Sequence, residues 1–326
     1  MNDAIEALPL PAPASRPRRF WRHPVTQMLA RIAFFLLAAA LIAYVFSLLP
    51  WQPPKTKGIS GELTQEPGWA AFKLLRSIVT VFGAYWLMVF LLERRPLDEL
   101  APRPAPLQLT VGWLLGMAVL LASTAAIALA GGFAVLGTNW DAPLLVPLLV
   151  LGIGPGVTEE IMFRGVLFRV VEQALGTWVA IVVSALFFGA VHLGNPNATW
   201  WSSLAIAIEA GFLLGIAFAW TRSLWFVMAL HAAWNFTQGP LLGVAVSGIA
   251  VNGLLRSSPR GPDIISGGEF GAEASLVTLV VCVALALSFT RRAAAAGRLV
   301  PPFWRRRADD GSVPQLRFPN AGMGQA

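Results

Sequence analysis

The chain has 326 residues, of which 56% are hydrophobic and only 13% charged, and its formal net charge is +7. Soluble globular domains carry about a quarter charged residues, so this composition excludes an ordinary soluble protein and indicates a membrane protein. The positive charge does not indicate nucleic-acid binding, because the arginines cluster at the chain ends and between apolar segments. Cys282 is the single cysteine and lies in an apolar segment, so we expect neither an internal disulfide nor a cysteine zinc site.

Apolar segments recur along the chain at lengths that suit membrane-spanning helices. A helix needs about 20 predominantly apolar residues to cross about 30 Å of hydrocarbon, and on this basis we predict an all-α, polytopic integral membrane protein with about eight spans. The first segment is longer than the roughly 7 to 15 residues of a signal-peptide core, so we expect a retained span. The spans are expected at 30–49, 75–92, 109–130, 143–171, 178–193, 203–220, 226–250 and 276–289.

Proline-containing and basic stretches flank the apolar region. Residues 1–24 are predicted to be a disordered cytoplasmic lead, residues 25–290 a transmembrane domain, and residues 291–326 a disordered cytoplasmic tail. Basic residues concentrate on the cytoplasmic side of spans, so the arginines before the first span and after the last predict that both termini are cytoplasmic. Lys55, Lys57, Arg256 and Arg260 fit this orientation less well. We expect a multi-pass protein of the cell inner membrane, in contact with the lipid bilayer.

The fourth segment combines a predicted irregularity with an acidic pair. Gly152, Gly154, Pro155 and Gly156 are expected to kink or break its helix just before Glu159 and Glu160. An ionisable group inside a span is costly to bury, so each one is a functional-site candidate. The candidates inside spans are Glu159, Glu160, Arg164, His192, Glu209 and His231.

The spacing of these residues predicts how they group. Glu160 and Arg164 are four residues apart on one helix face and can form an ion pair, whereas Glu159 is turned about 100° away from that pair. His231 and Asn235 share a face of the seventh span, as Phe188 and His192 share one of the fifth. At 1.5 Å rise per residue, Glu159, His192, His231 and Asn235 all lie roughly 13–21 Å from the cytoplasmic edge. We therefore expect them around one polar pocket near the middle of the membrane.

These residue types suit the hydrolysis of an amide. A buried carboxylate can take a proton from water, one imidazole can position that water, and a second imidazole with an Asn amide can donate to a developing oxyanion. Glu159, His192 and His231 also match the ligand types of a catalytic zinc site with an open position. The zinc-dependent and the metal-free mechanism both stay open at this point.

Three motifs resemble those of the CAAX-protease and bacteriocin-processing family, whose members are commonly called intramembrane metalloproteases. The patterns E-E-x-x-x-R, F-x-x-x-H and H-x-x-x-N occur here as T-E-E-I-M-F-R-G at 158–165, F-F-G-A-V-H at 187–192 and H-A-A-W-N at 231–235. Each motif alone is weakly specific, but all three occur in order on separate predicted spans, within residues 142–240.

The resemblance implies a helical membrane core and proteolysis within the bilayer. It implies that Glu159 is the base that activates water with His192, that His231 and Asn235 stabilise the oxyanion, and that Glu160, Arg164 and Phe188 support the site. The implied substrate is a membrane-embedded protein or a lipidated, membrane-anchored peptide. The metal stays open, because a metal-free glutamate mechanism is also argued for the family.

Two other functions and several structural roles are compatible with the same residues. Buried carboxylates and histidines also build proton relays, so a proton-coupled transporter is an alternative, although the chain lacks the internal repeat that transporters often have. A non-catalytic scaffold or immunity protein of the same fold is another. Phe188 is expected to be a packing residue, and Gly211 and Gly215 are expected to allow close helix packing. Glu209 belongs to no motif, so three roles stay open for it: a pair with a polar group on another helix, a position facing water, or membership of the site.

Overall fold

The computed structural model describes residues 21–306. Most of the predicted lead 1–24, and the part of the predicted tail from 307 onward, lie outside these residues. Within them, six helices are long and apolar enough to cross a membrane. They are α2 (Pro24–Ser47), α4 with η1 (Pro67–Glu93), α5 (Ala105–Leu129), the composite α6–α8 (Leu145–Leu175), the composite α10–α11 (Trp200–Thr221) and α14 (Leu276–Ala295).

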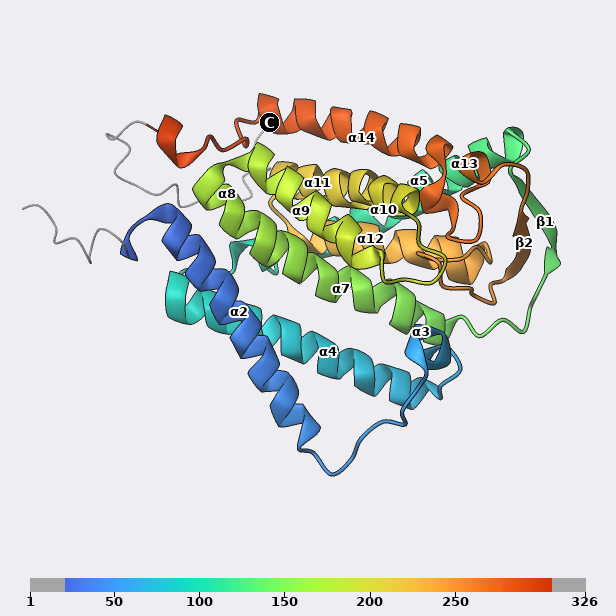
Figure 1. Cartoon of the computed structure of the whole chain (residues 1–326), viewed down its shortest axis with the longest axis horizontal. Helices are drawn as coiled ribbons and strands as arrows, with labels where there is room; N and C mark the ends of the chain where they lie inside the picture. The colour runs from blue at the N-terminus through green and yellow to red at the C-terminus, as the bar shows by residue number, and fades with distance from the viewer. Residues whose placement is uncertain (1–20, 307–326) are drawn as a thin grey trace, which may run out of the picture.

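Most of the long helices run roughly along the long axis of the molecule, whereas α2 lies oblique to them, and together they confirm a polytopic, mainly helical membrane fold (Figure 1). Helices α2 and α4 form one side of the bundle, and the remaining long helices pack together beside them. Large apolar side chains such as Leu37 on α2 and Val182 on α9 (Thr177–His192) are more than half exposed, as expected for surfaces that face lipid. Short helical turns occur in the connections: α3 (Gly58–Glu62), η2 (Asp98–Leu100), α13 (Asp263–Ser266), η7 (Ala272–Ala274) and η8 (Phe303–Arg305).

Two predicted spans are shorter helices in the structure. The fifth corresponds to α9, an apolar helix of 16 residues. The seventh, expected to run from Phe226 to Ala250, is α12 (Leu224–Phe236) followed by the π-helical turn η6 (Thr237–Leu241). The helix ends early because Pro240 has no N–H to donate and Gly243 takes a positive φ of 67°. Ala250 therefore lies in a loop, and the count of about eight spans stays a prediction.

The fourth predicted span remains one continuous helix, contrary to the break expected at its glycines and proline. It consists of α6 (Leu145–Pro147), η3 (Leu148–Ile153), α7 (Gly154–Glu160), η4 (Ile161–Phe168) and α8 (Arg169–Leu175), of which η3 and η4 are π-helical. Pro155 is tolerated because it is in the first turn of α7, directly after the π-helical turn. Wide π-helical turns thus flank the acidic pair, an arrangement that is frequent at functional sites.

Small residues bring α12 close to its neighbours. A Cβ atom added to Gly156 of α7 would lie 2.8 Å from Ala232 Cβ and 2.9 Å from Met228 O. Helix α12 also contacts α5. A Cβ atom added to Gly112 of α5 would lie only 2.4 Å from a carbonyl oxygen of α12, and one added to Gly116 only 2.3 Å from another. Helix α12, which carries His231 and Asn235, is therefore held between α5 and α7 at backbone contact distance.

The close packing expected for Gly211 is also observed, whereas Gly215 makes ordinary contacts. The composite helix of Gly211 consists of α10 (Trp200–Ile206), the π-helical η5 (Ala207–Phe212) and α11 (Leu213–Thr221). A Cβ atom on Gly211 would lie 2.7 Å from Ala185 Cα on α9, while one on Gly215 would find its nearest atoms at 3.8 Å. Close approach of η5 to α9 brings Glu209 toward the predicted site.

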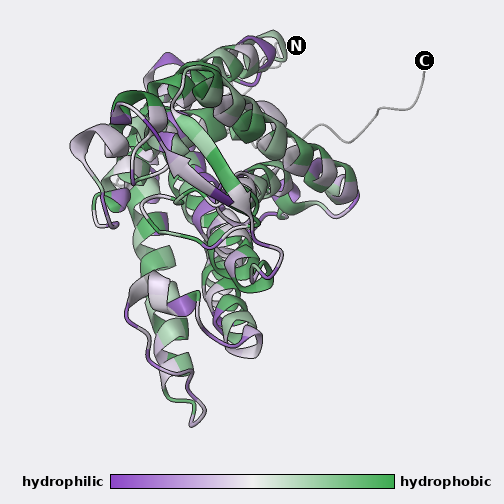
Figure 2. Ribbon diagram, turned by 90° about the vertical axis from the view of Figure 1, so that its right-hand side faces the viewer, coloured by the Kyte–Doolittle hydropathy of each residue, from purple (hydrophilic) through white to green (hydrophobic). Residues whose placement is uncertain are grey.

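A small antiparallel sheet, which the sequence did not predict, lies at one end of the bundle. Strand β1 (Phe133–Thr138) pairs with β2 (Leu255–Pro259), with Phe133 opposite Pro259 and Thr138 opposite Leu255. Figure 2 looks at this end and shows the sheet in front of mostly hydrophobic helices. The sheet is a local addition to an otherwise helical fold and connects α5 with the loop that follows η6.

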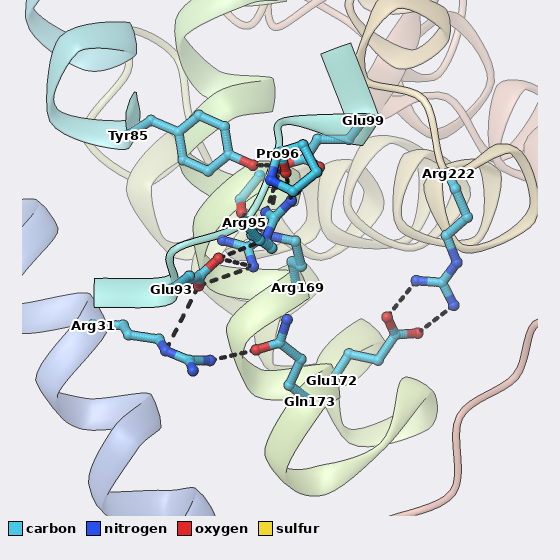
Figure 3. Close-up of polar contacts among 11 residues, drawn as sticks. Arg31, Tyr85, Glu93, Arg95, Pro96, Glu99, Arg169, Glu172, Gln173 and Arg222 are labelled. Carbon is cyan, nitrogen blue, oxygen red and sulfur yellow. Dashed lines mark hydrogen bonds and ion pairs between the residues drawn. The ribbon is translucent and has the colours of Figure 1, made fainter. Parts of the chain in front are cut away.

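The other end of the bundle, which we call the arginine-rich end, is held by buried ion pairs (Figure 3). The carboxylate of Glu93 accepts hydrogen bonds from Arg95 and Arg169, each at 2.8 Å, and lies 3.6 Å from Nε of Arg31. Arg95 also pairs with Glu99 at 2.7 Å. Burial raises the pKa of Glu99 and, together with the nearby Arg169, lowers the pKa of Arg95 to about 10. This network joins α2, η1, η2 and α8.

The residues that follow α14 are hydrogen-bonded to the arginine-rich end. The predicted tail boundary at residue 291 lies inside this helix, which continues through Ala295. Thr177 and Val300 then exchange hydrogen bonds, from Thr177 N to Val300 O at 2.9 Å and from Val300 N to Thr177 Oγ1 at 2.7 Å. Arg306 Nη1 donates to Gln173 O at 2.9 Å. Residues 298–306 are thus packed against the bundle, because their polar groups find partners at the end of α8 and the start of α9.

Candidate active site

The predicted site residues come from three helices that meet around one cavity. Glu159 is near the end of α7, His192 is the last residue of α9, and His231 and Asn235 are one turn apart on α12. All four line a cavity of about 430 Å³. The structure therefore brings together the residues that the three motifs singled out, although they are up to 76 positions apart in the chain.

Glu160 forms the predicted ion pair with Arg164 and an additional bond that the sequence did not predict. Its Oε1 accepts a hydrogen bond from Arg164 Nη1 at 2.8 Å and another from His231 Nδ1 at 2.8 Å. Glu160 and Arg164 are fully buried. Because a carboxylate only accepts, His231 donates from Nδ1, which leaves its Nε2 for the cavity. Glu160 thus links the acidic motif on α7 to the histidine motif on α12.

His192 is held by the backbone and by an aromatic ring. Its Nδ1 lies 2.7 Å from the carbonyl oxygen of Phe188, so Nδ1 carries the proton and Nε2 of the neutral ring is an acceptor. The Phe188 ring stacks on the His192 ring with centroids 4.7 Å apart and meets the His231 ring edge-on at 6.1 Å. Arg164 Cζ lies 4.9 Å from the centroid of the Phe188 ring. Phe188 is the packing residue that orients both imidazoles.

Glu159 is the carboxylate of this group that is free to react. It is partly buried and lines the cavity, and its Oε2 is buried without a hydrogen-bond partner among the described residues. This fits the predicted rotation of Glu159 away from the Glu160–Arg164 pair. A carboxylate that lines the same cavity as an acceptor imidazole can hold a water molecule and take its proton.

Asn235 has a structural contact in addition to its place at the cavity. Its Nδ2 donates to the carbonyl oxygen of Leu151 at 2.8 Å. This carbonyl lies in the π-helical η3, four residues before Pro155, which has no N–H to donate. One N–H of the Asn235 amide therefore satisfies a carbonyl in the proline-containing turn, and its role as oxyanion donor stays a prediction for the second N–H.

Two further carboxylates line the same cavity. Glu209 of η5 is 1% exposed and Glu273 of η7 is 3% exposed. The sequence left the role of Glu209 open, and it did not indicate Glu273, which lies in a connection outside every predicted span and motif. Glu273 reaches the cavity because the loop between η6 and α14 folds back over it with Val246, Ser247 and Ile249.

Among residues 21–306, no group of three or more His, Cys, Asp or Glu side chains is placed to hold a metal ion. The predicted ligands Glu159, His192 and His231 share the cavity, and the Nδ1 bonds of both imidazoles leave their Nε2 atoms available, as in histidines that bind a metal, but the three side chains are not gathered into a group that could hold the ion. We therefore derive no step through a metal, and zinc stays a prediction that rests on residue types.

Comparison with known families supports the predicted resemblance. Residues 141–237 match the family described as type II CAAX prenyl endopeptidase Rce1-like. The matched segment begins just before α6 and ends at the start of η6, so it contains the helices of all three motifs. No curated protein sequence matches the chain. The match shows that this segment is similar to the family and supports, at family level, a CAAX-protease-type intramembrane endopeptidase.

Proposed function

We propose that this chain, with its Rce1-like segment at residues 141–237, is an intramembrane endopeptidase that hydrolyses membrane-embedded or lipid-anchored protein substrates with water activated by Glu159. One observation carries the proposal. Glu159, one of whose oxygens has no hydrogen-bond partner among the described residues, lines the same cavity as His192, whose Nδ1 is bonded to a carbonyl and whose Nε2 is therefore an acceptor. A general base and a second acceptor at one cavity are what the activation of water requires.

In the proposed reaction, Glu159 and His192 hold a water molecule between them. Glu159 takes one proton as the water oxygen attacks the substrate carbonyl, and a tetrahedral oxyanion forms. His231, when it carries both ring protons, donates from Nδ1 to Glu160 and from Nε2 to the oxyanion, and Asn235 donates its second amide N–H. The C–N bond then breaks as Glu159 returns its proton to the leaving amine, which balances the protons.

Glu160 supports this step without contacting the substrate. Its carboxylate lies within hydrogen-bond distance of both Arg164 and His231, so it stabilises a positive charge on the imidazole that faces the oxyanion. The Arg164 guanidinium in turn compensates the buried carboxylate, and its Nη2 donates to Ala210 O at 2.6 Å. This chain of contacts fixes the direction in which His231 Nε2 points.

We infer that the substrate reaches the cavity from the lipid. The lining residues are mostly apolar, and the surrounding helices expose large hydrophobic side chains. A membrane-embedded helix or a lipid-modified peptide suits such surroundings better than a soluble peptide. We also propose that the protein belongs to the cell inner membrane with the arginine-rich end in the cytoplasm, since basic residues favour that side.

The proposal is tested by cleavage of membrane peptides by the purified full-length protein in liposomes. We expect cleavage by the wild type and a loss of kcat of about 100-fold or more in Glu159→Gln, since general-base catalysis contributes about 10² to 10⁴. Glu269→Gln, at an exposed carboxylate outside the cavity, is the matched control. Wild-type kcat in Glu159→Gln would contradict the role of the base.

The same sample tests the metal. Cleavage with and without a chelator, together with the metal content of tag-free protein, separates the two mechanisms. Loss of activity on chelation and recovery with zinc would support a metalloprotease, whereas full activity in metal-free protein would support the glutamate mechanism.

A further inference from the structure

Glu209 and Glu273 are buried carboxylates that the proposed reaction does not use. Both oxygens of Glu209, and Oε1 of Glu273, are buried without a hydrogen-bond partner among the described residues. Glu273 interacts electrostatically with Ser247, in the loop that closes over the cavity, and with the imidazoles of His192 and His231. Burial raises the pKa of Glu273. The two carboxylates interact electrostatically with each other, and both line the cavity of Glu159.

The other buried carboxylates among the described residues have arginine partners. Glu93, Glu99, Glu160 and Glu172 are each paired with at least one arginine. No Lys or Arg within residues 21–306 forms an ion pair with Glu209 or Glu273. An uncompensated carboxylate is costly to bury, and two of them close together cost more. A partner that is absent from the chain itself would relieve this cost.

The walls around the two carboxylates indicate the shape of that partner. The cavity lining includes the apolar side chains of Met162, Phe163, Ile206 and Leu213. Lys and Arg side chains combine an aliphatic stem with a terminal cation, so the stem can contact the apolar wall while the cation meets the carboxylates. His192 and His231 are the titratable groups on α9 and α12 that face the same cavity, and they are committed through Nδ1 to Phe188 and Glu160.

We propose that Glu209 and Glu273 form an acidic subsite that binds a Lys or Arg side chain of the peptide substrate close to the scissile bond. The subsite rests on the proposed protease function and adds a specificity to it. It unites a residue of the family segment, Glu209, with a residue outside it, Glu273. The carboxylates position the substrate and take no part in bond breaking.

The test compares pairs of N-acetylated membrane peptides that carry either Lys or norleucine at one position and are otherwise identical. In successive pairs this position is moved residue by residue across the cleaved region. Acetylation removes the charge of the N-terminal amine, so the Lys side chain is the only cation that differs between the two peptides. At one position we expect the full-length wild type to prefer Lys in kcat/KM by about tenfold or more, the scale of a hydrogen bond to a charged group. Glu209→Gln and Glu273→Gln should reduce this preference at least about fivefold, mainly through KM.

Control measurements separate specificity from folding and catalysis. Both glutamine variants should lose much less kcat/KM on the norleucine peptide than on the Lys peptide, and they should melt at the same or a higher temperature than the wild type, because each removes a costly buried charge. Glu269→Gln, on the same loop as Glu273 but exposed, should keep the full preference for Lys.

Three results would overturn the subsite. If the wild type cleaves the two peptides equally at every position, the subsite is overturned and the protease function stands. The same holds if the glutamine variants lose kcat/KM equally for both peptides. Failure of the wild type to cleave either peptide would overturn the proposed function together with the subsite that rests on it.

Discussion

His231 Nδ1 lies 2.8 Å from Glu160 Oε1, and the same oxygen accepts from Arg164 Nη1 at 2.8 Å. One oxygen of a fully buried carboxylate therefore accepts hydrogen bonds from a guanidinium on its own composite helix and from an imidazole on α12, 71 positions later in the chain. This shared oxygen holds α7 and α12 together at the cavity.

Glu160→Gln is expected to destabilise the protein and to lower its activity. The substitution leaves the Arg164 guanidinium buried without a carboxylate, and breaking a buried ion pair in this way costs about 3–5 kcal/mol. Chemical denaturation of the purified protein measures the loss. The double variant Glu160→Met with Arg164→Leu removes both charges, so it should regain most of the stability and remain inactive. Activity in that double variant would contradict a role of Glu160 in supporting His231.

Gly156→Val is expected to abolish activity although it changes no ionisable group. An added Cβ at this position already meets Ala232 Cβ at 2.8 Å, so the larger side chain must move α7 away from α12 and separate Glu160 from His231. Cleavage assays and the melting temperature measure the effect. Gly215→Ala, where the nearest atoms lie at 3.8 Å, is the control and should keep both properties. Wild-type cleavage in Gly156→Val would show that this close approach is not needed.

Asn235→Ala is expected to cost about 1–3 kcal/mol of stability, because the Leu151 carbonyl then loses the amide that it accepts. Pro155→Ala restores a backbone N–H four residues after Leu151, the spacing of an α-helical hydrogen bond. The stability loss of Asn235→Ala should therefore shrink in the Pro155→Ala background, which a double-mutant cycle measures. Activity should stay low in the double variant if Asn235 also donates to the oxyanion, and its recovery would assign Asn235 a structural role alone.

Glu172→Gln is expected to destabilise the arginine-rich end strongly. Both oxygens of Glu172 pair with the buried Arg222 guanidinium, so the variant leaves a charge without its partner at a cost of about 3–5 kcal/mol. The control is Glu62→Gln, which breaks the more exposed Lys73 pair and should cost less than about 1 kcal/mol. Equal losses in the two variants, measured by denaturation, would contradict the structural importance of this network.

Much of the fold could be predicted from the sequence because its signals are local. Apolar length identified the helices, and the four-residue spacing of Glu160 and Arg164 predicted their ion pair. Other features could not be predicted in this way. The π-helical turns kept the helix intact at Pro155, and Pro240 ended α12 before Ala250. Both outcomes depend on how the backbone accommodates a proline, which periodicity does not report.

The sequence by itself determined that this is a helical membrane protein and which helices carry Glu159, His192, His231 and Asn235, since hydropathy and motif spacing are properties of neighbouring residues. Only the tertiary structure decided that Glu160 bonds to His231, that Asn235 also serves the Leu151 carbonyl, and that Glu273 enters the cavity. These contacts join residues 71 or more positions apart, or bring in a loop without a span or motif. They follow from how closely the helices pack at small residues, which no local pattern specifies.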